Sequence, residues 1–364
     1  MPKVVHVVGA RPNFVKIAPV MAALGAAGDI TQRLVHTGQH YDDALSRIFF
    51  DELRLPRPDR DLGVGSGTHS AQTAAMMIQL EPVLVAERPD LVVVVGDVNS
   101  TLAAALVAAK LDLPVAHLEA GLRSFDRRMP EEANRVVVDH LSTLLLAPTA
   151  TAAANLAREG LAPAAIATVG NVMIDTLLTH RAGAPWDEVQ RTLGLDERRY
   201  AVLTLHRPAN VDDPSRLRAL VAEVSRAAGS WPVLFPAHPR TKRQLEAHGI
   251  DLAGSNLRVC APFGYRAFLA LMDHAACVFT DSGGIQAETT ALGVPCLTLR
   301  DTTEWPETIA AGTNTLVGTD PDQVGLWIAA ALGAPRPPQP PIALWDGHAA
   351  ARAAAAIRDW LARR

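Results

Sequence analysis

Residues 91–118 read LVVVVGDVNSTLAAALVAAKLDLPVAHL and alternate between strand and helix character. The opening LVVVV is an uninterrupted β-branched run, typical of a strand that is covered on both faces. LAAALVAAK follows with a helical pattern, and LDLPVAHL repeats the apolar strand. Because a strand, a helix and a strand in this order make a parallel unit, both strands should end at the same edge of one sheet. The stretch predicts an open α/β fold, which binds ligands at the carboxyl edge of its strands.

Acidic residues follow these two strands. Asp97 comes after the first strand, Glu119 comes after the second, and a PEE sequence adds Glu131 and Glu132. A single acid at such a place is most often a helix cap or a surface charge. Carboxylates concentrated at one sheet edge instead favour proton transfer, and we take the set as a candidate catalytic group.

The N-terminal segment predicts an anion-binding turn. A strand at residues 3–8 leads through glycine into a helical pattern, and Arg11 and Lys16 lie at its start. Amide groups at a helix N-terminus and nearby cations suit a phosphate. The GxGxxG pattern does not occur there, so the turn gives no support for a nicotinamide cofactor. The next strand, residues 33–37, ends near His40, which by itself is an ordinary loop residue.

The rest of the first half repeats strand and helix. Residues 55–70 are rich in proline, glycine and charge and predict a loop, and a helix is expected at 71–86. A strand at 144–147 and a helix at 151–158 follow. Residues 166–178 predict a last strand and the passage into a second domain.

The second half starts the same pattern again, with apolar strands that end in polar residues. These strands are expected at 201–205, 232–236, 257–260, 276–280 and 294–299. The predicted fold is α/β, with two doubly wound Rossmann-like domains facing a cleft, at residues 1–172 and 173–345. The proline-rich segment 333–341 cannot form regular structure, and residues 346–364 end the chain in an amphipathic helix.

The segment DSGGIQAE, residues 281–288, predicts a diphosphate site. Ser282 can cap a helix whose first turn exposes the amides of Gly283 and Gly284, and glycine lets a ligand approach the backbone. The carboxylate of Glu288 could accept hydrogen bonds from ribose hydroxyls. The alternative is a plain capped helix, and the paired glycines favour the phosphate site.

Composition limits the classes of partner. The 364 residues are 49% hydrophobic and 20% charged, with a formal net charge of −4. Without a basic stripe, nucleic acid and anionic membrane are not expected as partners. The N-terminus lacks a signal-peptide pattern and no apolar run approaches membrane-spanning length, which favours a cytoplasmic protein. Three widely spaced cysteines in apolar runs predict buried thiols.

A resemblance to a known family rests on a series of motifs in order along nearly the whole chain. They are GARPNFVKIAP, HTGQH, GDVNST, HLEAGLRS, MPEEANR, VGN, HRP, HP, DSGGIQAE, RDTTEWPE and GHAAAR. With these the sequence resembles the non-hydrolysing UDP-N-acetylglucosamine 2-epimerases. The resemblance implies the two-domain fold of nucleotide-sugar glycosyltransferases, called GT-B, with the last helix packing back on the first domain. It also implies a homodimer, a UDP-sugar substrate, and no metal or nicotinamide cofactor.

The implied reaction is an elimination followed by a re-addition at carbon-1 and carbon-2 of the sugar. The resemblance assigns proton transfer to Asp97, Glu119, Glu131 and His206. The UDP-sugar would be bound by Arg11, Lys16, His206, Ser282, Gly283, Gly284, Glu288 and Arg300. Clustered acids near a diphosphate should raise one another's proton affinity, so at least one would be protonated. The sequence leaves open which acid removes the carbon-2 proton.

Many members of this family have a second, activating UDP-sugar site. The residues here that would line it are Gln39, His40 and His238. Asp42 stands where some members have glutamine, and Ala75 stands where an arginine would be expected. Because the loss of a cation weakens a phosphate site, we expect activation by substrate to be weakened.

The sequence is compatible with several alternative functions. A hydrolysing relative would release N-acetylmannosamine and UDP, and a related epimerase would act on a UDP-diacetamido sugar. A glycosyltransferase of the same fold is disfavoured because the acids suit proton abstraction better than acceptor binding. A UDP-sugar-binding regulator without turnover would not need all three acids.

Overall fold

The computed structural model describes residues 1–39, 43–336 and 341–364. His40, Asp42 and the middle of the proline-rich segment therefore lie outside the described residues. The chain forms two compact units, the first made of residues 1–179 with 343–364 and the second of residues 180–342. The expected boundary after residue 172 falls at the start of helix α7, Val172–Arg181.

The first unit contains a parallel sheet. Its strands are β1 (Lys3–Val8), β2 (Thr31–His36), β3 (Arg60–Asp61), β4 (Leu91–Val95), β5 (Val115–Leu118), β6 (Leu144–Ala147) and β7 (Ile166–Thr168). Within the described residues they lie in the order β3-β2-β1-β4-β5-β6-β7, all parallel. All five residues of β4 are buried, as its uninterrupted apolar run predicts. The chain reverses direction across the sheet after β3, so β1 and β4 lie together at its centre.

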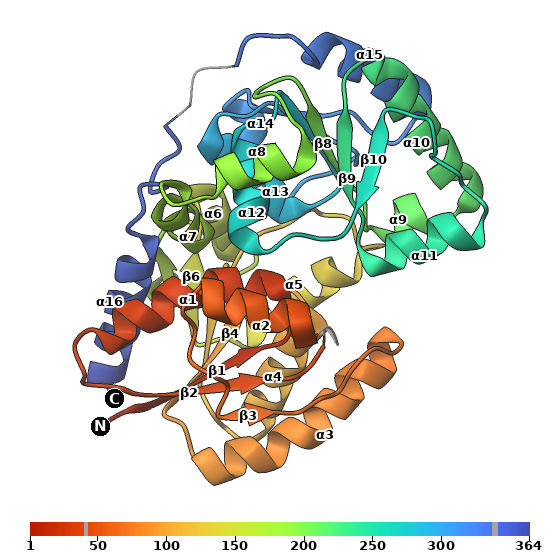
Figure 1. Ribbon diagram of the computed structural model, residues 1–364. Coiled ribbons are helices and arrows are strands. Elements are labelled where there is room, and N and C mark those ends of the chain that lie inside the picture. Colours follow the sequence, from red (N-terminus) through yellow and green to blue (C-terminus); the bar gives the residue numbers. More distant parts are fainter. Residues whose placement is uncertain (40–42, 337–340) are drawn as a thin grey trace. The chain divides into compact units, whose positions relative to one another are not determined.

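Helices cover both faces of this sheet (Figure 1). They are α1 (Arg11–Gly25), α2 (Asp43–Glu52), α3 (His69–Glu87), α4 (Asn99–Lys110), α5 (Pro130–Leu141) and α6 (Ala150–Arg158), with α7 and a C-terminal α16 (Ala349–Ala362). Helix α1 packs with α2 and α16, whereas α3 packs with α4, and α4 with α5. The right-handed crossovers from β1 to β3 place their helices on one face of the sheet, and those from β4 to β7 place theirs on the other. Both faces of the sheet are therefore buried.

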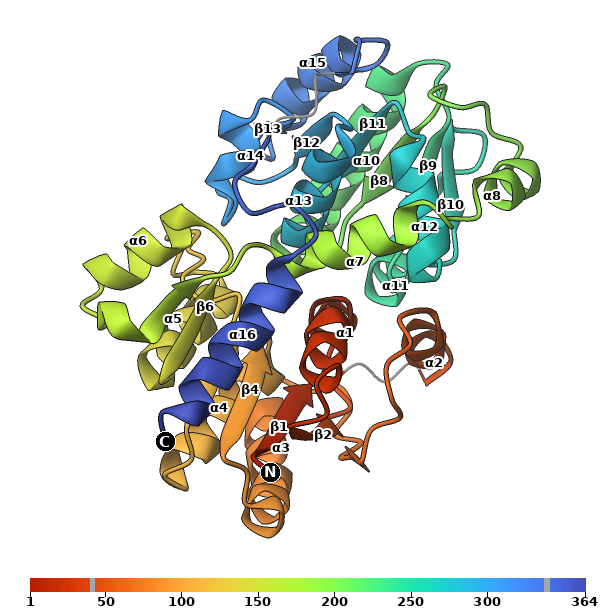
Figure 2. The same cartoon turned by 90° about the vertical axis from the view of Figure 1, so that its left-hand side faces the viewer.

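The C-terminal helix returns to the first unit, as Figure 2 shows for α16 beside α1. The guanidinium group of Arg358 donates to the carbonyl oxygens of Ala23, at 3.1 Å, and Leu24, at 2.8 Å, near the end of α1. Asp175 of α7 accepts hydrogen bonds from the first amides of α16, Ala349 at 3.1 Å and Ala350 at 2.7 Å. The prediction that the last helix packs back on the first domain is confirmed.

The second unit has its own parallel sheet. Its strands are β8 (Ala201–Thr204), β9 (Val233–Pro236), β10 (Leu257–Cys260), β11 (Cys277–Thr280), β12 (Cys296–Thr298) and β13 (Asn314–Leu316). Among the described residues their order is β10-β9-β8-β11-β12-β13, again with a reversal, here between β10 and β11. The short β13 was not anticipated from the sequence. The α/β class with two doubly wound parallel sheets is confirmed.

Helices lie on both faces of the second sheet as well. They are α8 (Trp186–Leu193), α9 (Pro208–Val211), α10 (Pro214–Ala228), α11 (Pro239–Ala247), α12 (Tyr265–Asp273), α13 (Gly283–Leu292), α14 (Pro306–Ala310) and α15 (Pro321–Ala331). Helix α15 packs on α10, and α13 packs between α12 and α14. The core between β8, β11 and α10 is apolar and includes Leu203, Leu220, Val224 and Phe279.

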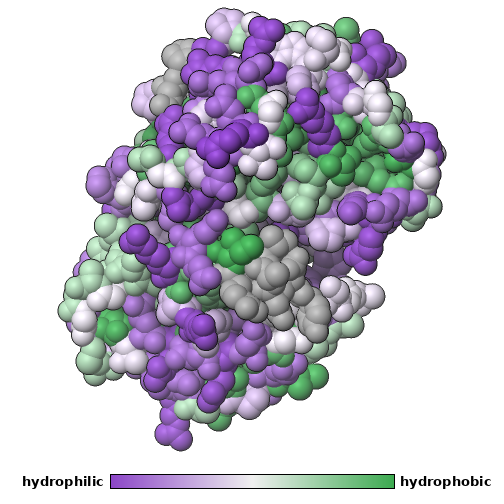
Figure 3. Space-filling model, in the orientation of Figure 1, coloured by the Kyte–Doolittle hydropathy of each residue, from purple (hydrophilic) through white to green (hydrophobic). Residues whose placement is uncertain are grey.

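The surface mixes polar and apolar residues. Hydrophilic residues are interspersed with smaller hydrophobic groups over the face shown in Figure 3. In the part of the chain that the structure describes, no helix is both long enough and apolar enough to cross a bilayer.

Candidate active site

Asp97 and Glu119 follow neighbouring strands of the first sheet. Val95 at the end of β4 is paired with Leu118 at the end of β5, and the amide of Gly96 donates to the carbonyl oxygen of Leu118 at 3.0 Å. Gly96 has a φ of 65°, and a Cβ built there would lie 3.3 Å from the Glu119 carboxylate. The parallel register therefore brings the two acids to one edge, and glycine leaves room for Glu119 over the turn.

Glu119 is held in a constrained backbone conformation. Its φ of 77° lies in the left-handed region that residues with a side chain rarely adopt. The amides of Glu119 and Ala120 both donate to the carbonyl oxygen of Leu146, each at 3.1 Å, and so support this turn from β6. Backbone strain of this kind persists where the surrounding structure enforces it, and it is concentrated at functional sites.

Lys16 pairs with Glu119 inside the first unit. Lys16 is only 8% exposed although lysine is normally a surface residue, and its ammonium group forms an ion pair with the Glu119 carboxylate. Helix α1 is fixed at this point by Asn13, which donates to the carbonyl oxygen of Val95 at 3.0 Å and accepts from the amides of Gly9 and Ala10. The predicted anion-binding lysine thus contacts one of the predicted proton-transfer acids.

Burial controls the protonation of Glu119. Loss of water raises the pKa of this carboxyl, the charge of Lys16 opposes that shift, and the neighbouring charge of Asp97 adds to it. The pKa of Glu119 is raised above its ordinary value, so the group takes up a proton more readily than an exposed glutamate. A carboxyl whose pKa moves toward neutrality is suited to general acid–base catalysis.

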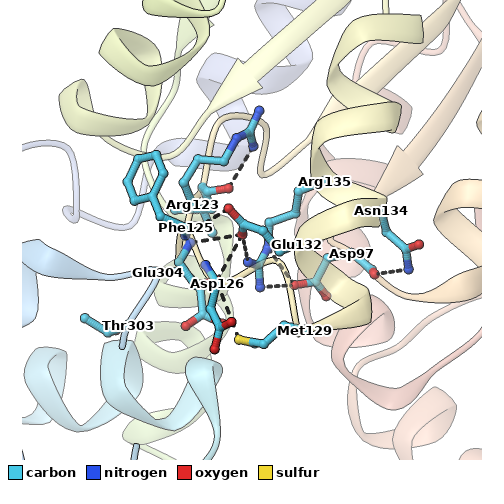
Figure 4. Close-up of polar contacts among 12 residues, drawn as sticks. Asp97, Arg123, Phe125, Asp126, Met129, Glu132, Asn134, Arg135, Thr303 and Glu304 are labelled. Atoms are coloured by element: carbon cyan, nitrogen blue, oxygen red, sulfur yellow. Dashed lines mark hydrogen bonds and ion pairs between the residues drawn. The ribbon is translucent and has the colours of Figure 1, made fainter. Parts of the chain in front are cut away.

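Arg135 of α5 fixes Asp97 (Figure 4). Its guanidinium Nε and Nη2 atoms lie 3.0 and 2.7 Å from Asp97 Oδ2, and Asn134 donates to the Asp97 carbonyl oxygen at 2.8 Å. The Asp97 side chain is 27% exposed, so it remains reachable from solvent. Two guanidinium bonds to one oxygen orient the carboxylate.

The two consecutive glutamates of the PEE sequence have different roles. Glu132 is 1% exposed and accepts hydrogen bonds from the amides of Ser124 at 3.0 Å and Phe125 at 2.9 Å, while Arg135 Nη1 lies 2.6 Å away. These contacts make Glu132 a support for the loop after Glu119. Glu131 is only partly buried in the first turn of α5, and its role in proton transfer remains a prediction.

In the second unit Asp281 orients His206. Asp281 is fully buried after β11 and accepts hydrogen bonds from the amides of His206 and Arg207 and from the side chain of Asn210, at 2.9 to 3.1 Å. His206 Nδ1 lies 2.9 Å from Asp281 Oδ1, and the imidazole is 42% exposed. Burial alone would raise the pKa of Asp281, but His206 and these donors outweigh it and lower the pKa to about 2. The Asp281 carboxylate lies within hydrogen-bond distance of Nδ1 and so orients the His206 ring.

The start of α13 is glycine-rich, and a carboxylate lies beside it. Ser282 occupies the N-cap position, but within the described residues its side chain makes no capping hydrogen bond, contrary to expectation. A Cβ on Gly283 would lie 3.0 Å from Glu304 Oε1. Glu304 in turn pairs with Arg300, at 2.8 Å, and more distantly with Arg207, at 3.6 Å. Two guanidinium groups are therefore held near the amides of this helix start.

Glu288 lies on α13 beyond this turn. It is 6% exposed, and burial, together with the charge of Glu288 and its hydrogen bond, raises the pKa of Tyr265 well above the ordinary value. The roles of Ser282, Gly283, Gly284, Glu288 and Arg300 in binding a UDP-sugar stay predictions, as does that of Arg11 at the first position of α1.

The residues predicted for a second site belong to both units. Gln39 Oε1 accepts hydrogen bonds from Ser100, from the amide at 3.1 Å and from Oγ at 2.5 Å. Ala75 lies on α3, and His238 is the N-cap of α11, where Nδ1 accepts from the Arg240 amide at 3.3 Å. The weakened second site stays a prediction.

Sequence reasoning missed Arg135 and the orienting role of Asp281. Arg135 has a local signal, because the spacing EEANR puts it on the helix face of Glu131 and Glu132. Asp281 is the first residue of the DSGG segment, and a polar residue directly after a buried strand is the available signal.

Two doubly wound α/β units are characteristic of the GT-B fold, which is typical of proteins that act on nucleotide sugars, and this chain has that fold. The sequence model described as UDP-N-acetylglucosamine 2-epimerase matches residues 22–358, and the chain belongs to this family.

Among the relatives, the UDP-N-acetylglucosamine 2-epimerase of Methanocaldococcus jannaschii is 45% identical over 327 residues, covering 87% of this chain and 89% of the relative. The UDP-2,3-diacetamido-2,3-dideoxy-D-glucuronate 2-epimerase of Pseudomonas aeruginosa is 42% identical, covering 88% and 90%. A crystal structure of the M. jannaschii enzyme in complex with UDP-GlcNAc and UDP superposes with a TM-score of 0.92 at 40% identity, covering 98% of this chain and 99% of that one.

Proposed function

We propose that this enzyme interconverts UDP-N-acetylglucosamine and UDP-N-acetylmannosamine. The observation that carries the proposal is the pairing of two carboxylates with two cations in the first unit: Glu119 with Lys16, and Asp97 with Arg135. One acid has a raised pKa, so the pair offers both a proton acceptor and a proton donor. Membership of the 2-epimerase family supports the same activity.

The proposed steps conserve atoms and charge. A carboxylate among Asp97, Glu119 and Glu131 removes the carbon-2 proton as the bond between carbon-1 and the diphosphate oxygen breaks. That oxygen keeps the bonding electron pair, giving UDP and 2-acetamidoglucal by anti elimination. An acid then returns a proton to carbon-2 from the opposite face, and the diphosphate oxygen adds back to carbon-1 in a syn addition.

The departing diphosphate requires positive charge and oriented donors. We assign this task to Arg11, Lys16 and the imidazole of His206, which Asp281 orients. The Gly283–Gly284 turn at the start of α13 and Arg300 would add amides and charge. Replacing Arg11 with alanine is expected to weaken UDP binding and turnover together, as calorimetry and initial rates would show. Unchanged UDP affinity would contradict the assignment of Arg11.

A diacetamido uronic acid sugar is the second candidate substrate, because a 42% identical relative carries that activity in its name. Phosphorus and proton NMR of the purified protein with each UDP-sugar in turn, without added metal or nicotinamide, separates the candidates. Conversion of UDP-N-acetylglucosamine to UDP-N-acetylmannosamine at the higher kcat/KM supports the main proposal. Turnover of the diacetamido sugar alone, or release of free N-acetylmannosamine, would overturn it.

We also infer a homodimer in the cytoplasm. Ile78 and Val85 are 71% and 54% exposed on α3, and their spacing of seven residues places them on one helix face. Such a face is suited to a second copy of the chain. Light scattering coupled to gel filtration should give twice the 38.7 kDa chain mass. Cys260, Cys277 and Cys296 are free, in agreement with a reducing compartment.

A further inference from the structure

A buried histidine and a buried aspartate pair close to the acids of the first unit. His117 on β5 and Asp139 on α5 are both completely buried, and His117 Nδ1 lies 2.6 Å from Asp139 Oδ1. The other ring nitrogen, Nε2, lies 2.7 Å from the carbonyl oxygen of Gly96. Gly96 immediately precedes Asp97, and His117 lies two residues before Glu119. One imidazole therefore connects the backbone segments that present both acids.

The hydrogen-bond partners of this ring show which of its nitrogens donates to Gly96. A carbonyl oxygen only accepts, so Nε2 must carry a proton to bond Gly96. Burial alone would raise the pKa of Asp139, but His117 and Arg123 outweigh it, and the pKa of Asp139 is lowered. The same ring therefore contacts Asp139 through Nδ1 while it donates from Nε2 to Gly96.

Asp139 extends the connection to the loop after Glu119. Its Oδ2 atom accepts from the amide of Gly121 at 3.1 Å and lies 2.7 Å from Arg123 Nη1. Gly121 has a φ of 83°, and a Cβ there would lie 2.3 Å from the carbonyl oxygen of Ala152, so this turn has no room for a side chain. Arg123 is held on its other side by Glu159, at 2.7 Å.

We propose that His117, paired with Asp139, is a positioning residue that holds the Gly96 carbonyl and thereby fixes Asp97 relative to Glu119. This role rests on the proposed function, because the distance between the two acids matters only if both act on one substrate. Misplacement of a catalytic group by about 1 Å costs roughly 100-fold in rate. A hydrogen bond to the residue before Asp97, set from the strand that carries Glu119, prevents that movement.

Two substitutions remove the two hydrogen bonds of His117 one at a time. In His117→Asn the amide takes the place of Nδ1 and can still donate to Asp139, but the bond to Gly96 is lost. In His117→Gln the longer side chain places its amide near Nε2 and can still donate to Gly96, at the expense of the bond to Asp139. His140→Asn is the matched control, because His140 is an exposed residue on the same helix as Asp139.

We expect His117→Asn to lower kcat roughly 10- to 100-fold while the Kd for UDP changes by less than about threefold. His117→Gln should retain more of kcat than His117→Asn, and His140→Asn should be unchanged. Equal kcat for His117→Asn and the wild type would overturn the positioning role, as would a larger loss in His117→Gln. If His117→Asn does not fold, His117→Gln is compared with the wild type instead. A loss of kcat above about tenfold in His117→Gln would contradict the prediction.

A measurement without turnover tests the same ring. Nitrogen-15 NMR of the histidine-labelled wild type should show a proton on Nε2 of His117. An Nε2 without a proton would overturn the hydrogen bond to the Gly96 carbonyl. An inactive wild type would overturn the proposed function, whereas an active wild type with a fully active His117→Asn would overturn only the positioning role.

Discussion

Glu119 and Asp281 are both buried carboxyl groups next to the ends of parallel strands, yet their pKa values move in opposite directions. Glu119 contacts one cation and shares its surroundings with a second acid, and its pKa is raised chiefly by burial. Asp281 receives hydrogen bonds from two amides, one side-chain amide and an imidazole, and its pKa falls to about 2. The number of donors, more than the depth of burial, separates a carboxyl that can exchange a proton from one that serves as a fixed charge.

The largest expected effect is on the acid side of this comparison. Glu119→Gln keeps the size of the side chain but removes its proton chemistry, so kcat should fall roughly 10²- to 10⁴-fold with little change in UDP affinity. Asp97→Asn and Glu131→Gln should behave alike. Steady-state rates and calorimetric UDP binding provide the check, with exposed Glu81→Gln as control. A variant that keeps near-normal turnover would show that its acid is not catalytic.

Replacing Lys16, the cation that contacts Glu119, should increase the difference in pKa between Glu119 and Asp281. In Lys16→Met the charge that opposes the upward shift is lost, so the pKa of Glu119 should rise further. The limb of the pH–rate profile that reports the ionised acid should move to higher pH, and kcat at pH 7 should fall on the order of 100-fold. Lys110→Met, at an exposed position, is the control. An unshifted profile would mean that Lys16 does not set the protonation of Glu119.

Asp281 should influence stability against acid. Its pKa in the folded state, about 2, is below the usual value of 3.8, so its ionised form stabilises the fold above about pH 4 and that stabilisation is lost as the pH falls toward 2. The contribution is roughly 2 kcal/mol, and Asp281→Asn should lack this pH dependence. Urea unfolding between pH 7 and 2, with exposed Asp251→Asn for comparison, measures it. Equal pH dependence in both variants would contradict the assignment.

The smallest effect concerns Glu132, which resembles Asp281 more than Glu119. The hydroxyl of Ser124 donates to Glu132 at 3.1 Å, one of several bonds to this carboxylate. Ser124→Ala should lower the free energy of unfolding by about 1 kcal/mol and leave kcat unchanged. Urea unfolding and rates at pH 7 test both expectations, and exposed Ser66→Ala is the reference. A large loss of kcat would place Glu132 in the reaction after all.

The sequence was sufficient to predict a feature of the structure where that feature depends on a single strand or helix. Strand β4 was predicted from its uninterrupted apolar run. The place of the two acids at one sheet edge was predicted from their positions directly after β4 and β5. The sequence pattern alone does not show which of Glu131 and Glu132 supports the loop after Glu119. Neighbouring helix residues point about 100° apart, and where each of them points depends on how α5 packs. Arg135 and Glu132 meet locally, but the loop amides that donate to Glu132 come from a separate segment.

His117 shows the same limit more clearly. A histidine inside an apolar strand is a visible anomaly in VAHL, but its partner Asp139 lies 22 residues further on and its other partner is a backbone carbonyl. Only the packing of α5 against the sheet brings these groups together. Strand β13 was missed because its sequence, NTL, has a single apolar residue and so gives no apolar run to detect.

The most direct test of the central claim is deuterium incorporation at carbon-2 during epimerisation in deuterated water, followed by proton NMR. If the buried acids of the first unit remove and return this proton, UDP-N-acetylmannosamine formed by the wild type carries solvent deuterium at carbon-2, and Glu119→Gln incorporates far less over the same time. Product that forms without deuterium at carbon-2, or equal incorporation by Glu119→Gln, would contradict the account.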